Sequence, residues 1–251
     1  MLVDQRRQQI LQVVESKGFV SLQELSELCD ASESTVRRDL EHLDSHGTIR
    51  RTRGGAAFTG ESLITFDDRE KQSLNEKQAI AKYIAAQIEP NETVLLDGGT
   101  TTLEVARQLI GKEIQVVTNS LPIVTLLSNQ PGIELVIIGG YLYPKTGVSL
   151  GPIAIDGLKG ISARRLVMST GGITEKGLFN SNVLLVETER QMMSVADEII
   201  VAADSTKFGH SELTHLCELQ EVQRIVTDSN VRDTWKKTCQ QSGVELVTVA
   251  V

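Results

Sequence analysis

The chain has 251 residues, of which 40% are hydrophobic and 23% charged, values typical of a globular protein with one large domain or two smaller ones. Its formal net charge of -8 argues against a protein that coats nucleic acid with its whole surface, but leaves room for a small basic module. Three scattered cysteines favour a reducing compartment and show neither a disulfide framework nor metal-ligand spacing, and no stretch is apolar enough for a signal peptide or a membrane span. We therefore expect a cytoplasmic protein with no metal site and no membrane segment.

Residues 5–57 predict three helices followed by a hairpin. The first helix, 5–17, has apolar residues at helical spacing along one face. Ser21 and Glu24 have the spacing of a capping box, which predicts the start of a short second helix.

The third helix and the hairpin are predicted by similar signals. Ser32 can cap this helix and Gly47 can end it, and its apolar positions recur at helical spacing at Val36, Leu40 and Leu43. Residues 48–57 combine β-branched side chains with a Gly-Gly pair, which is typical of a tight hairpin.

The side of the third helix opposite its apolar face suits DNA recognition. Its first two turns carry Ser34, Thr35, Arg37 and Arg38, side chains that can hydrogen-bond bases and phosphates. The hairpin adds Arg50, Arg51 and Arg53, so that five arginines stand against three acidic residues between Thr35 and Arg53. The arginines alone do not decide between a recognition helix and a solvated helix of a small helical domain.

Residues 5–57 resemble the DNA-binding domain of the DeoR family of bacterial sugar-catabolism repressors. The resemblance rests on RRQQIL at 6–11, STVRRDL at 34–40 and IRRTRGGA at 49–56. It implies a winged helix-turn-helix, 1–57, in which Thr35, Arg37 and Arg38 contact operator DNA, joined by Ser34 of the same turn. Arg51 and Arg53 would then lie on the wing.

Residues 58–74 are expected to form a linker, and residues 75–251 a second domain. An amphipathic helix is predicted at 75–88, with isoleucines at four-residue spacing. Seven apolar runs then alternate with helical stretches, at 93–96, 114–118, 134–138, 165–169, 198–203, 224–227 and 244–249. Such runs predict buried parallel strands with crossover helices, and hence a doubly wound α/β fold.

Four polar groups follow or lie near the ends of these predicted strands. Because the carboxyl ends of parallel strands meet at one edge of a sheet, we expect them to form one ligand site. The groups are Asp97, Gly98, Gly99, Thr100, Thr101 and Thr102; then Thr118, Asn119 and Ser120; then Asn180, Ser181 and Asn182; and Asp204 with Lys207. Gly140, in a further glycine-rich turn, is expected beside them.

The chemistry of these groups favours a phosphorylated sugar. A Gly-Gly turn that leads into a helix offers N–H groups to an anion, Lys207 supplies a positive charge, and Asn180 and Asn182 can pair with hydroxyls. Each group also has a plainer interpretation, as a tight β–α connection, a salt bridge or a helix cap. Residues 75–251 resemble the DeoR effector domain, similar in fold to ribose-5-phosphate isomerase, which implies a sugar-phosphate effector. The additional amides of Asn180 and Asn182 favour a hexose phosphate.

The prediction is therefore a DNA-binding repressor of sugar-metabolism genes that a sugar phosphate releases from its operator. The alternative is a sugar-phosphate isomerase with an accessory DNA-binding domain, for which Asp97, Glu187 and Asp204 offer carboxylates. No assembled set of acid and base groups is apparent, so we expect no enzyme and no cofactor. A near-symmetric operator requires two DNA-binding domains, which predicts a homo-oligomer, either a dimer or a tetramer.

Overall fold

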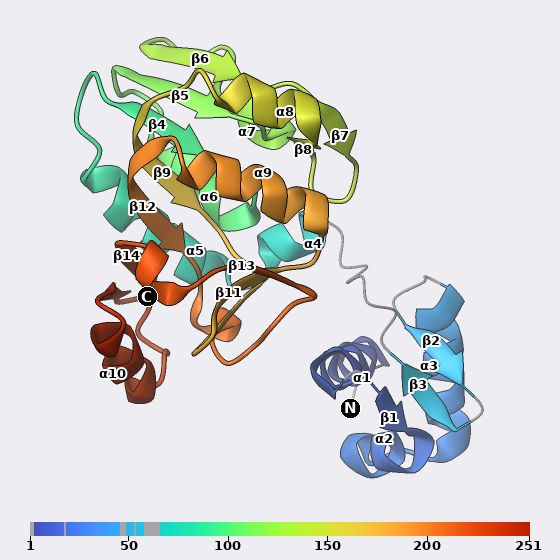
Figure 1. Cartoon of the computed structure of the whole chain (residues 1–251). Coiled ribbons are helices and arrows are strands. Elements are labelled where there is room, and N and C mark those ends of the chain that lie inside the picture. The colour runs from blue at the N-terminus through green and yellow to red at the C-terminus, as the bar shows by residue number, and fades with distance from the viewer. Residues whose placement is uncertain (1–2, 18, 46–48, 53, 58–65) are drawn as a thin grey trace. The chain divides into compact units, whose positions relative to one another are not determined.

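The computed structural model describes residues 3–17, 19–45, 49–52, 54–57 and 66–251 (Figure 1). The chain divides into two compact units, Met1–Ile64 and Thr65–Val251, called here the N-terminal and C-terminal units. Of the expected linker, residues 58–65 lie outside the described residues, and helix α4 (Phe66–Lys71) occupies most of the remainder. Gly47 and Arg53 also lie outside the described residues.

The N-terminal unit contains the three predicted helices and the predicted hairpin. They are α1 (Val3–Lys17), α2 (Leu22–Cys29), α3 (Glu33–Ser45), β2 (Arg50–Thr52) and β3 (Gly55–Ala57). The hydroxyl of Ser21 accepts a hydrogen bond from the Glu24 N–H at 3.2 Å, and that of Ser32 accepts one from the Thr35 N–H at 3.3 Å. The predicted caps of α2 and α3 are therefore confirmed.

A third strand, β1 (Phe19–Ser21), holds the hairpin against the helices. The sheet order is β1-β3-β2, and both strand pairs are antiparallel. A Cβ at Gly55 would lie 2.1 Å from the carbonyl oxygen of Val20, so only glycine allows β1 and β3 to approach this closely. The Leu22 N–H also donates to the Gly54 carbonyl at 2.9 Å, which joins the start of α2 to the hairpin turn.

The C-terminal unit is built on a seven-stranded sheet in which every strand pair is parallel. In spatial order the strands are β15 (Glu245–Val249), β14 (Arg224–Asp228), β12 (Ala196–Ala202), β9 (Ala163–Met168), β4 (Thr93–Leu96), β5 (Ile114–Thr118) and β6 (Ile133–Ile137). These are the seven runs that the sequence predicted, with bounds shifted by at most two residues at either end.

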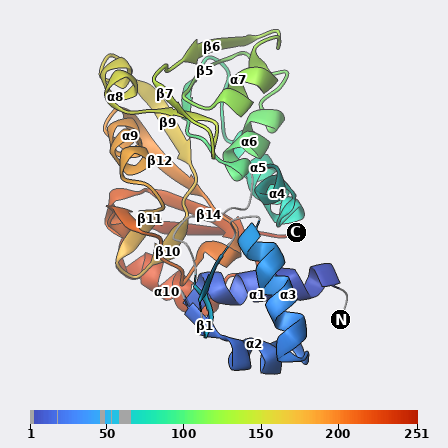
Figure 2. The ribbon, with the colours of Figure 1, turned by 90° about the vertical axis from the view of Figure 1, so that its right-hand side faces the viewer.

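Helices cover both faces of this sheet, as Figure 2 shows. One core joins α5 (Leu74–Ala86), α6 (Thr100–Gln108) and α7 (Leu121–Leu127) to one face. The other joins α8 (Pro152–Leu158), α9 (Val183–Met193) and α10 (Asp233–Gln241) to the opposite face. Neighbouring strand residues such as Leu95 and Leu96 belong to different cores, because strand side chains alternate between faces. The predicted doubly wound α/β fold is confirmed.

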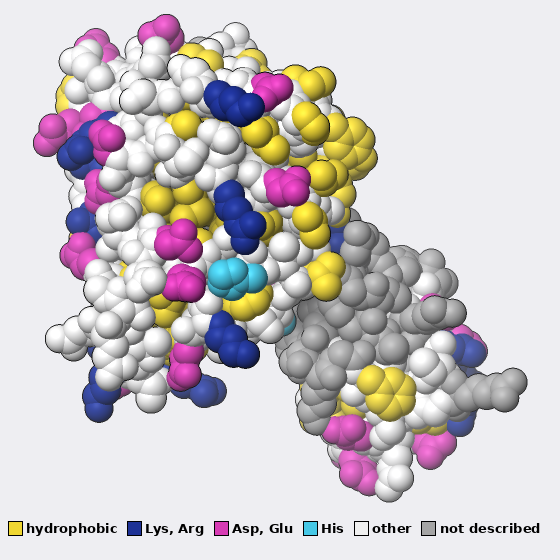
Figure 3. All heavy atoms as spheres, viewed as in Figure 1, with side chains coloured by type: hydrophobic (Ala, Val, Ile, Leu, Met, Phe, Trp, Pro, Cys, Tyr) yellow, Lys and Arg dark blue, Asp and Glu magenta, His cyan; other side chains and the backbone are white. Residues whose placement is uncertain are grey.

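Short strands that the sequence analysis did not predict surround the large sheet. They are the hairpin β7 (Tyr141–Tyr143) with β8 (Val148–Leu150), and the antiparallel set β10 (Gly172–Thr174), β11 (Gly177–Asn180) and β13 (Thr214–Cys217). Exposed apolar side chains gather near β7, α8 and the start of α9, among them Tyr141, Ile153 and Val183 (Figure 3). None of the helices in the described residues combines the length and apolarity needed to cross a membrane.

The connection order places a topological switch point at the centre of the sheet. From β4 the chain adds β5 and β6 on one side, and then returns with β9 on the other side of β4. Ligands in open α/β sheets bind at the carboxyl ends of the strands beside such a point. We call this edge of the sheet the rim.

Candidate functional site

The side of α3 that carries the predicted DNA contacts is exposed, while its opposite side is packed. Val36 and Leu40 are buried, whereas Ser34, Arg37 and Arg38 are exposed and Thr35 is half-buried. The apolar spacing of α3 therefore turns the predicted DNA-contacting side chains outward together.

An ionic cluster fixes α3 against α1. Asp39, which is 2% exposed, accepts hydrogen bonds from Arg6 Nε at 2.6 Å and Arg7 Nε at 2.9 Å. The hydrogen bond from Arg6 raises the pKa of that guanidinium, against the effect of burial. Because Asp39 is neutralised by α1, it does not offset the positive charge of the exposed arginines on α3.

Two of the exposed arginines have acidic neighbours, and one does not. Arg51 of the wing pairs with Glu41, and Arg37 lies 3.5 Å from Glu33. These pairs are exposed, so they are weak and can give way to phosphates. Within the described part of the chain, Arg38 pairs with no carboxylate. Arg53 lies outside the described residues.

Arg38→Ala is therefore expected to reduce specific operator affinity by about 1–3 kcal/mol, the range for losing an arginine that binds a guanine in two places. Fluorescence anisotropy with operator and scrambled duplexes, at several salt concentrations, measures this change. Arg38→Lys is the control, because lysine keeps the charge without the two-point geometry. An equal loss on both duplexes in Arg38→Ala, with a flatter salt dependence, would make Arg38 a phosphate contact instead.

In the C-terminal unit, the turn from β4 into α6 leaves the start of a helix without a side-chain cap. Gly99 stands at the N-cap of α6 and offers no side-chain acceptor to the first N–H groups of that helix. A Cβ at Gly98 would lie 2.0 Å from Val148 Cγ1, and one at Gly99 would lie 2.2 Å from Ser169 Oγ. Because these two positions are glycines, Val148 and Ser169 can pack directly against the turn. The first N–H groups of α6 have no side-chain cap and could bind a ligand.

The threonines of this motif are less open than the turn. Thr100, Thr101 and Thr102 are all buried within the C-terminal unit. The hydroxyl of Thr102 donates to the Gly99 carbonyl at 2.9 Å, so it stabilises the helix start itself. The Thr102 hydroxyl is therefore engaged within the protein, and the uncapped backbone N–H groups at the start of α6 are the candidate anion donors of the motif.

Asp97 lies at the switch point, where its N–H donates to the Val167 carbonyl of β9 at 3.1 Å. The side chain is 1% exposed, and neither carboxylate oxygen has a hydrogen-bond partner. Burial raises the pKa of Asp97 to about 7, although the nearby N–H groups of Gly98 and Ser169 act in the opposite direction.

Glu189 of α9 is a second buried carboxylate, and the sequence analysis did not select it. It is 1% exposed, its Oε1 accepts a hydrogen bond from Asn180 Nδ2 at 2.6 Å, and its Oε2 is buried without a partner. Burial and the negative charge of Asp97 raise the pKa of Glu189 well above its usual range. Glu189 lies three residues from both Val186 and Met192, and this helical spacing was the signal that could have placed it on the buried side of α9. Glu187, the carboxylate that the sequence analysis named instead, is exposed.

In the motif after β5, some polar atoms form hydrogen bonds within the protein and others have no partner. The Thr118 hydroxyl donates to the Leu96 carbonyl at 2.7 Å and accepts from the Ser120 N–H at 3.1 Å, so it joins β4 to the turn. Asn119 Nδ2 donates to the Ser149 carbonyl at 3.0 Å. Asn119 Oδ1 and Ser120 Oγ are buried without partners and remain available to a ligand.

The third motif divides in the same way. Asn180 contacts Glu189, as described above, whereas Asn182 caps α9 by accepting from the N–H groups of Leu184 and Leu185 at 2.8 and 3.3 Å. Ser181 is half-buried between them. A Cβ at Gly140 would lie 2.7 Å from the Leu150 carbonyl oxygen, so this glycine allows the backbones to pack closely.

Positive charge gathers near the fourth motif. Asp204 caps the short helix Ser205–Lys207 by accepting from the Thr206 N–H at 3.1 Å. Lys207 is half-buried, and no described residue accepts a hydrogen bond from its ammonium group. Burial lowers the pKa of Lys77 to about 8, and the charges of Asp204, Lys207 and Glu104 also act on it.

Lys77 and Arg69 are cations near the rim that the sequence analysis missed. Lys77 is 4% exposed and donates to the Arg69 carbonyl and, at 2.5 Å, to the Gln72 carbonyl, which fixes the end of α4 to α5. The Arg69 guanidinium contacts the Lys145 carbonyl at 3.5 Å, and its Nε is buried without a partner.

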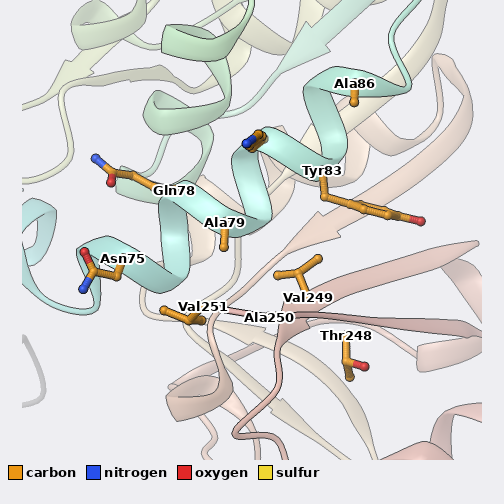
Figure 4. A pocket seen from close by; sticks show the side chains of 10 residues that line it. Asn75, Gln78, Ala79, Tyr83, Ala86, Thr248, Val249, Ala250 and Val251 are labelled. Carbon is orange, nitrogen blue, oxygen red and sulfur yellow. The ribbon is translucent and has the colours of Figure 1, made fainter.

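A hollow of about 790 Å³ lies away from these motifs, between α5 and the end of β15 (Figure 4). Tyr83, Ala79 and Val249 line it with other residues of the two segments. No predicted site residue contributes to it, and it offers one charged side chain, Lys82. Its polar lining residues, which include Asn75, Gln78 and Thr248, belong to none of the predicted motifs, so we place the candidate ligand site at the rim.

Asp97→Asn is expected to stabilise the free protein at high pH. Because the pKa of Asp97 is raised to about 7, the native state holds more protons than the unfolded chain between pH ~4 and ~7, and stability falls as pH rises through that range. An uncharged amide removes this loss, so Asp97→Asn is expected to unfold at a higher urea concentration than the wild type at pH ~8 and to lose that advantage at pH ~4. Urea unfolding at both ends of the range measures it.

The control for that experiment is Asp156→Asn, since Asp156 is exposed on α8. Its effect on stability is expected to be small at every pH. If Asp97→Asn changes stability equally at low and high pH, then the ionisation of Asp97 does not oppose folding.

Two family models together match most of the chain. Residues 6–61 match the DeoR-like helix-turn-helix domain, and residues 72–229 match the DeoR C terminal sensor domain. The chain is 32% identical to the uncharacterized HTH-type transcriptional regulator YulB of Bacillus subtilis, over 99% of this chain and 98% of YulB. It is also 32% identical to the HTH-type transcriptional repressor CsqR of Escherichia coli, over 96% and 94% of the two chains.

Solved structures with a similar course of the chain include ribose 5-phosphate isomerase A from Methanocaldococcus jannaschii. That likeness has a TM-score of 0.41 and 16% sequence identity, and it covers 55% of each chain.

Proposed function

Because the chain belongs to the DeoR family of transcriptional regulators, we propose that it represses genes of sugar metabolism and leaves its operator when a phosphorylated sugar binds at the rim. It is a regulator and not an enzyme, since both family models and the full-length relatives are those of regulators. In this proposal it works in the cytoplasm, and double-stranded operator DNA and the sugar phosphate are its partners.

The start of α6 carries the proposal of a phosphate ligand. Its N-cap, Gly99, leaves the first N–H groups of the helix without a side-chain acceptor, at the switch point of a parallel sheet. A helix start of this kind favours an anion through its N–H groups and its dipole. Lys207 supports the same ligand, because its ammonium has no partner among the described residues and lies near other rim charges.

Unpaired oxygens at the rim support a sugar as the rest of the effector. Both oxygens of Asp97, Oδ1 of Asn119, Oγ of Ser120 and Oε2 of Glu189 are buried without partners. Buried polar atoms are normally hydrogen-bonded, so five unpaired oxygens favour a ligand rich in hydroxyl groups. We propose a hexose phosphate, since a hexose offers more hydroxyls than a pentose.

The DNA-binding proposal requires more than one copy of the winged helix-turn-helix domain. An operator with two-fold symmetry is read by two recognition helices related by the same symmetry, which predicts a homodimer or a homotetramer. Ser34, Thr35, Arg37 and Arg38 of α3, with Arg51 and Arg53 of the wing, are the proposed DNA contacts.

Release of labelled upstream DNA tests the proposal. The purified chain is expected to bind this duplex with a salt-dependent affinity and to release it on addition of one member of a panel of hexose and pentose phosphates. The same sugar without its phosphate is the control and is expected to leave the complex intact. Binding that shows no salt dependence would contradict the repressor, and equal release by the unphosphorylated sugar would contradict the phosphate site.

A further inference from the structure

An exposed apolar patch lies on the C-terminal unit, where the hairpin β7–β8 meets the starts of α8 and α9 (Figure 3). Its members are large side chains that are 43–71% exposed. More than half of the exposed large apolar side chains in the described part of the C-terminal unit belong to this patch. The members are Leu121, Tyr141, Leu142, Ile153, Val183 and Leu184.

Contacts between the elements join these side chains into one surface. Strand β8 and helix α9 share a small buried apolar cluster, and the Leu121 N–H of α7 donates to the Gly147 carbonyl of the hairpin turn at 2.8 Å. A Cβ at Gly140, just before β7, would lie 3.2 Å from Ala154 Cβ of α8, and α8 also contacts β8. The hairpin is therefore in contact with all three helices that contribute to the patch.

The patch lies in a part of the chain that carries little charge. Residues 114–155 include two charged side chains, Glu134 and Lys145, although 23% of the whole chain is charged. On α9 the first charged residue is Glu187, which follows both patch residues of that helix. The centres of protein interfaces are depleted in charge, whereas a DNA-binding surface needs clustered lysines and arginines. The composition of the patch is therefore that of a protein interface.

The size of the patch also indicates a protein partner. Its half-exposed side chains present roughly 500 Å² of apolar surface, near the upper end for a monomeric protein and a large part of the about 800 Å² that each partner of a standard interface buries. A phosphorylated sugar is hydrophilic and far too small to cover such a surface.

A second copy of the chain is the partner that these features favour. Contact about a two-fold axis brings the patch against itself, and an apolar surface whose few charges have opposite signs does not repel its own copy. A two-fold operator also requires two DNA-binding domains. In the N-terminal unit, the exposed large apolar side chains of the described residues are spread over α1, β1 and α2, so the C-terminal unit offers the more continuous surface.

We propose that two copies of the chain pair through this patch about a two-fold axis, with the interface beside the candidate effector site of each copy. Leu121, Tyr141 and Val183 each come directly after a predicted effector residue, so the patch adjoins the rim. The proposal rests on the proposed function in its need for two DNA-binding domains, and it assigns the surface through which they are held together.

Ile153→Asp tests the pairing in the full chain. Ile153 is 71% exposed at the start of α8, where an acidic residue suits the helix, so the variant is expected to fold as the wild type does. At the interface the same change buries an unpaired charge, and the dissociation constant of the pair is expected to rise about a hundredfold or more. Sedimentation velocity over micromolar concentrations measures this rise, and circular dichroism checks the fold.

Tyr141→Ala removes apolar area without adding a charge, and the dissociation constant is expected to rise about tenfold. Val251→Asp is the matched control. Val251 is 59% exposed and lines the hollow between α5 and β15, at the opposite edge of the sheet from β6, so wild-type association is expected. Dissociation by Val251→Asp alone would place the interface at the hollow and overturn the proposal.

Sedimentation and DNA binding separate this proposal from the proposed function. If the wild type is monomeric, or if Ile153→Asp and Tyr141→Ala both associate as the wild type does, the interface is wrong, and release of DNA by a sugar phosphate decides the proposed function independently. If both variants dissociate but no sugar phosphate of the panel releases upstream DNA from the wild type, the pairing stands and the proposed function fails.

Discussion

Replacing Lys207 with alanine is expected to weaken effector binding ten- to a hundredfold while operator binding without effector stays near normal. The ammonium of Lys207 has no partner among the described residues, so its removal disturbs little in the free protein. A charge-assisted hydrogen bond to a phosphate is worth about 1.5–3 kcal/mol, which corresponds to the expected fall in affinity. Calorimetric titration of the effector measures it, and the variant is expected to repress in cells without responding to the sugar.

Lys176→Ala is the matched control for Lys207→Ala. Lys176 is exposed in the turn between β10 and β11, and its loss removes the same charge from the C-terminal unit. Wild-type effector affinity is expected for this variant. Unchanged effector affinity in Lys207→Ala would remove the lysine from the proposed site.

Replacing Asp39 with alanine is expected to destabilise the N-terminal unit by about 2–3 kcal/mol, somewhat below the range for breaking a fully buried ion pair. The variant leaves Arg6 and Arg7 without their shared carboxylate, and the side chains of these arginines are only 13% and 26% exposed. Loss of the cluster also weakens the packing of α3 on α1, so operator affinity is expected to fall although Asp39 is buried and lies off the exposed side of α3.

The single tryptophan of the chain makes this destabilisation measurable. Trp235 lies on α10 of the C-terminal unit, so its fluorescence reports that unit alone, whereas circular dichroism reports both. In urea, Asp39→Ala is expected to advance the dichroism transition of the N-terminal unit and to leave the fluorescence transition in place. Glu41→Ala, an exposed change on α3, is expected to alter stability by less than about 0.5 kcal/mol. Equal effects of the two changes would show that the cluster does not stabilise the fold.

The large sheet could be predicted from the sequence because each of its strands is an apolar run bounded by turn residues. Strands such as β4 and β5 are buried on both faces, so their sequence reads as a continuous apolar run. The recognition helix was predictable for a related reason, since its buried positions repeat at helical spacing. The predicted bounds of β4 and β5 also placed Asp97 and Asn119 correctly, directly after the ends of these strands.

The remaining strands and part of the site gave weaker signals. Strands β1, β7 and β10 have three residues each, which is too short for an alternating pattern to stand out. Glu189 and Lys77 were missed because charged residues on helices are usually solvated, and only the packing of α9 and α5 shows that these two are buried. Asn182 could not be separated from a ligand contact by sequence, since a helix cap uses the same side chain.

The switch point divides the parallel sheet into two groups of strands that meet only where β4 pairs with β9. One group, β4 to β6, carries Asp97, Asn119 and Ser120, and the other carries Ser169 and the segments of Glu189 and Lys207. A ligand that contacts residues of both groups links them across the β4–β9 strand pair. Occupancy would therefore slow the local opening of this strand pair and so protect β4 and β9 from amide hydrogen exchange.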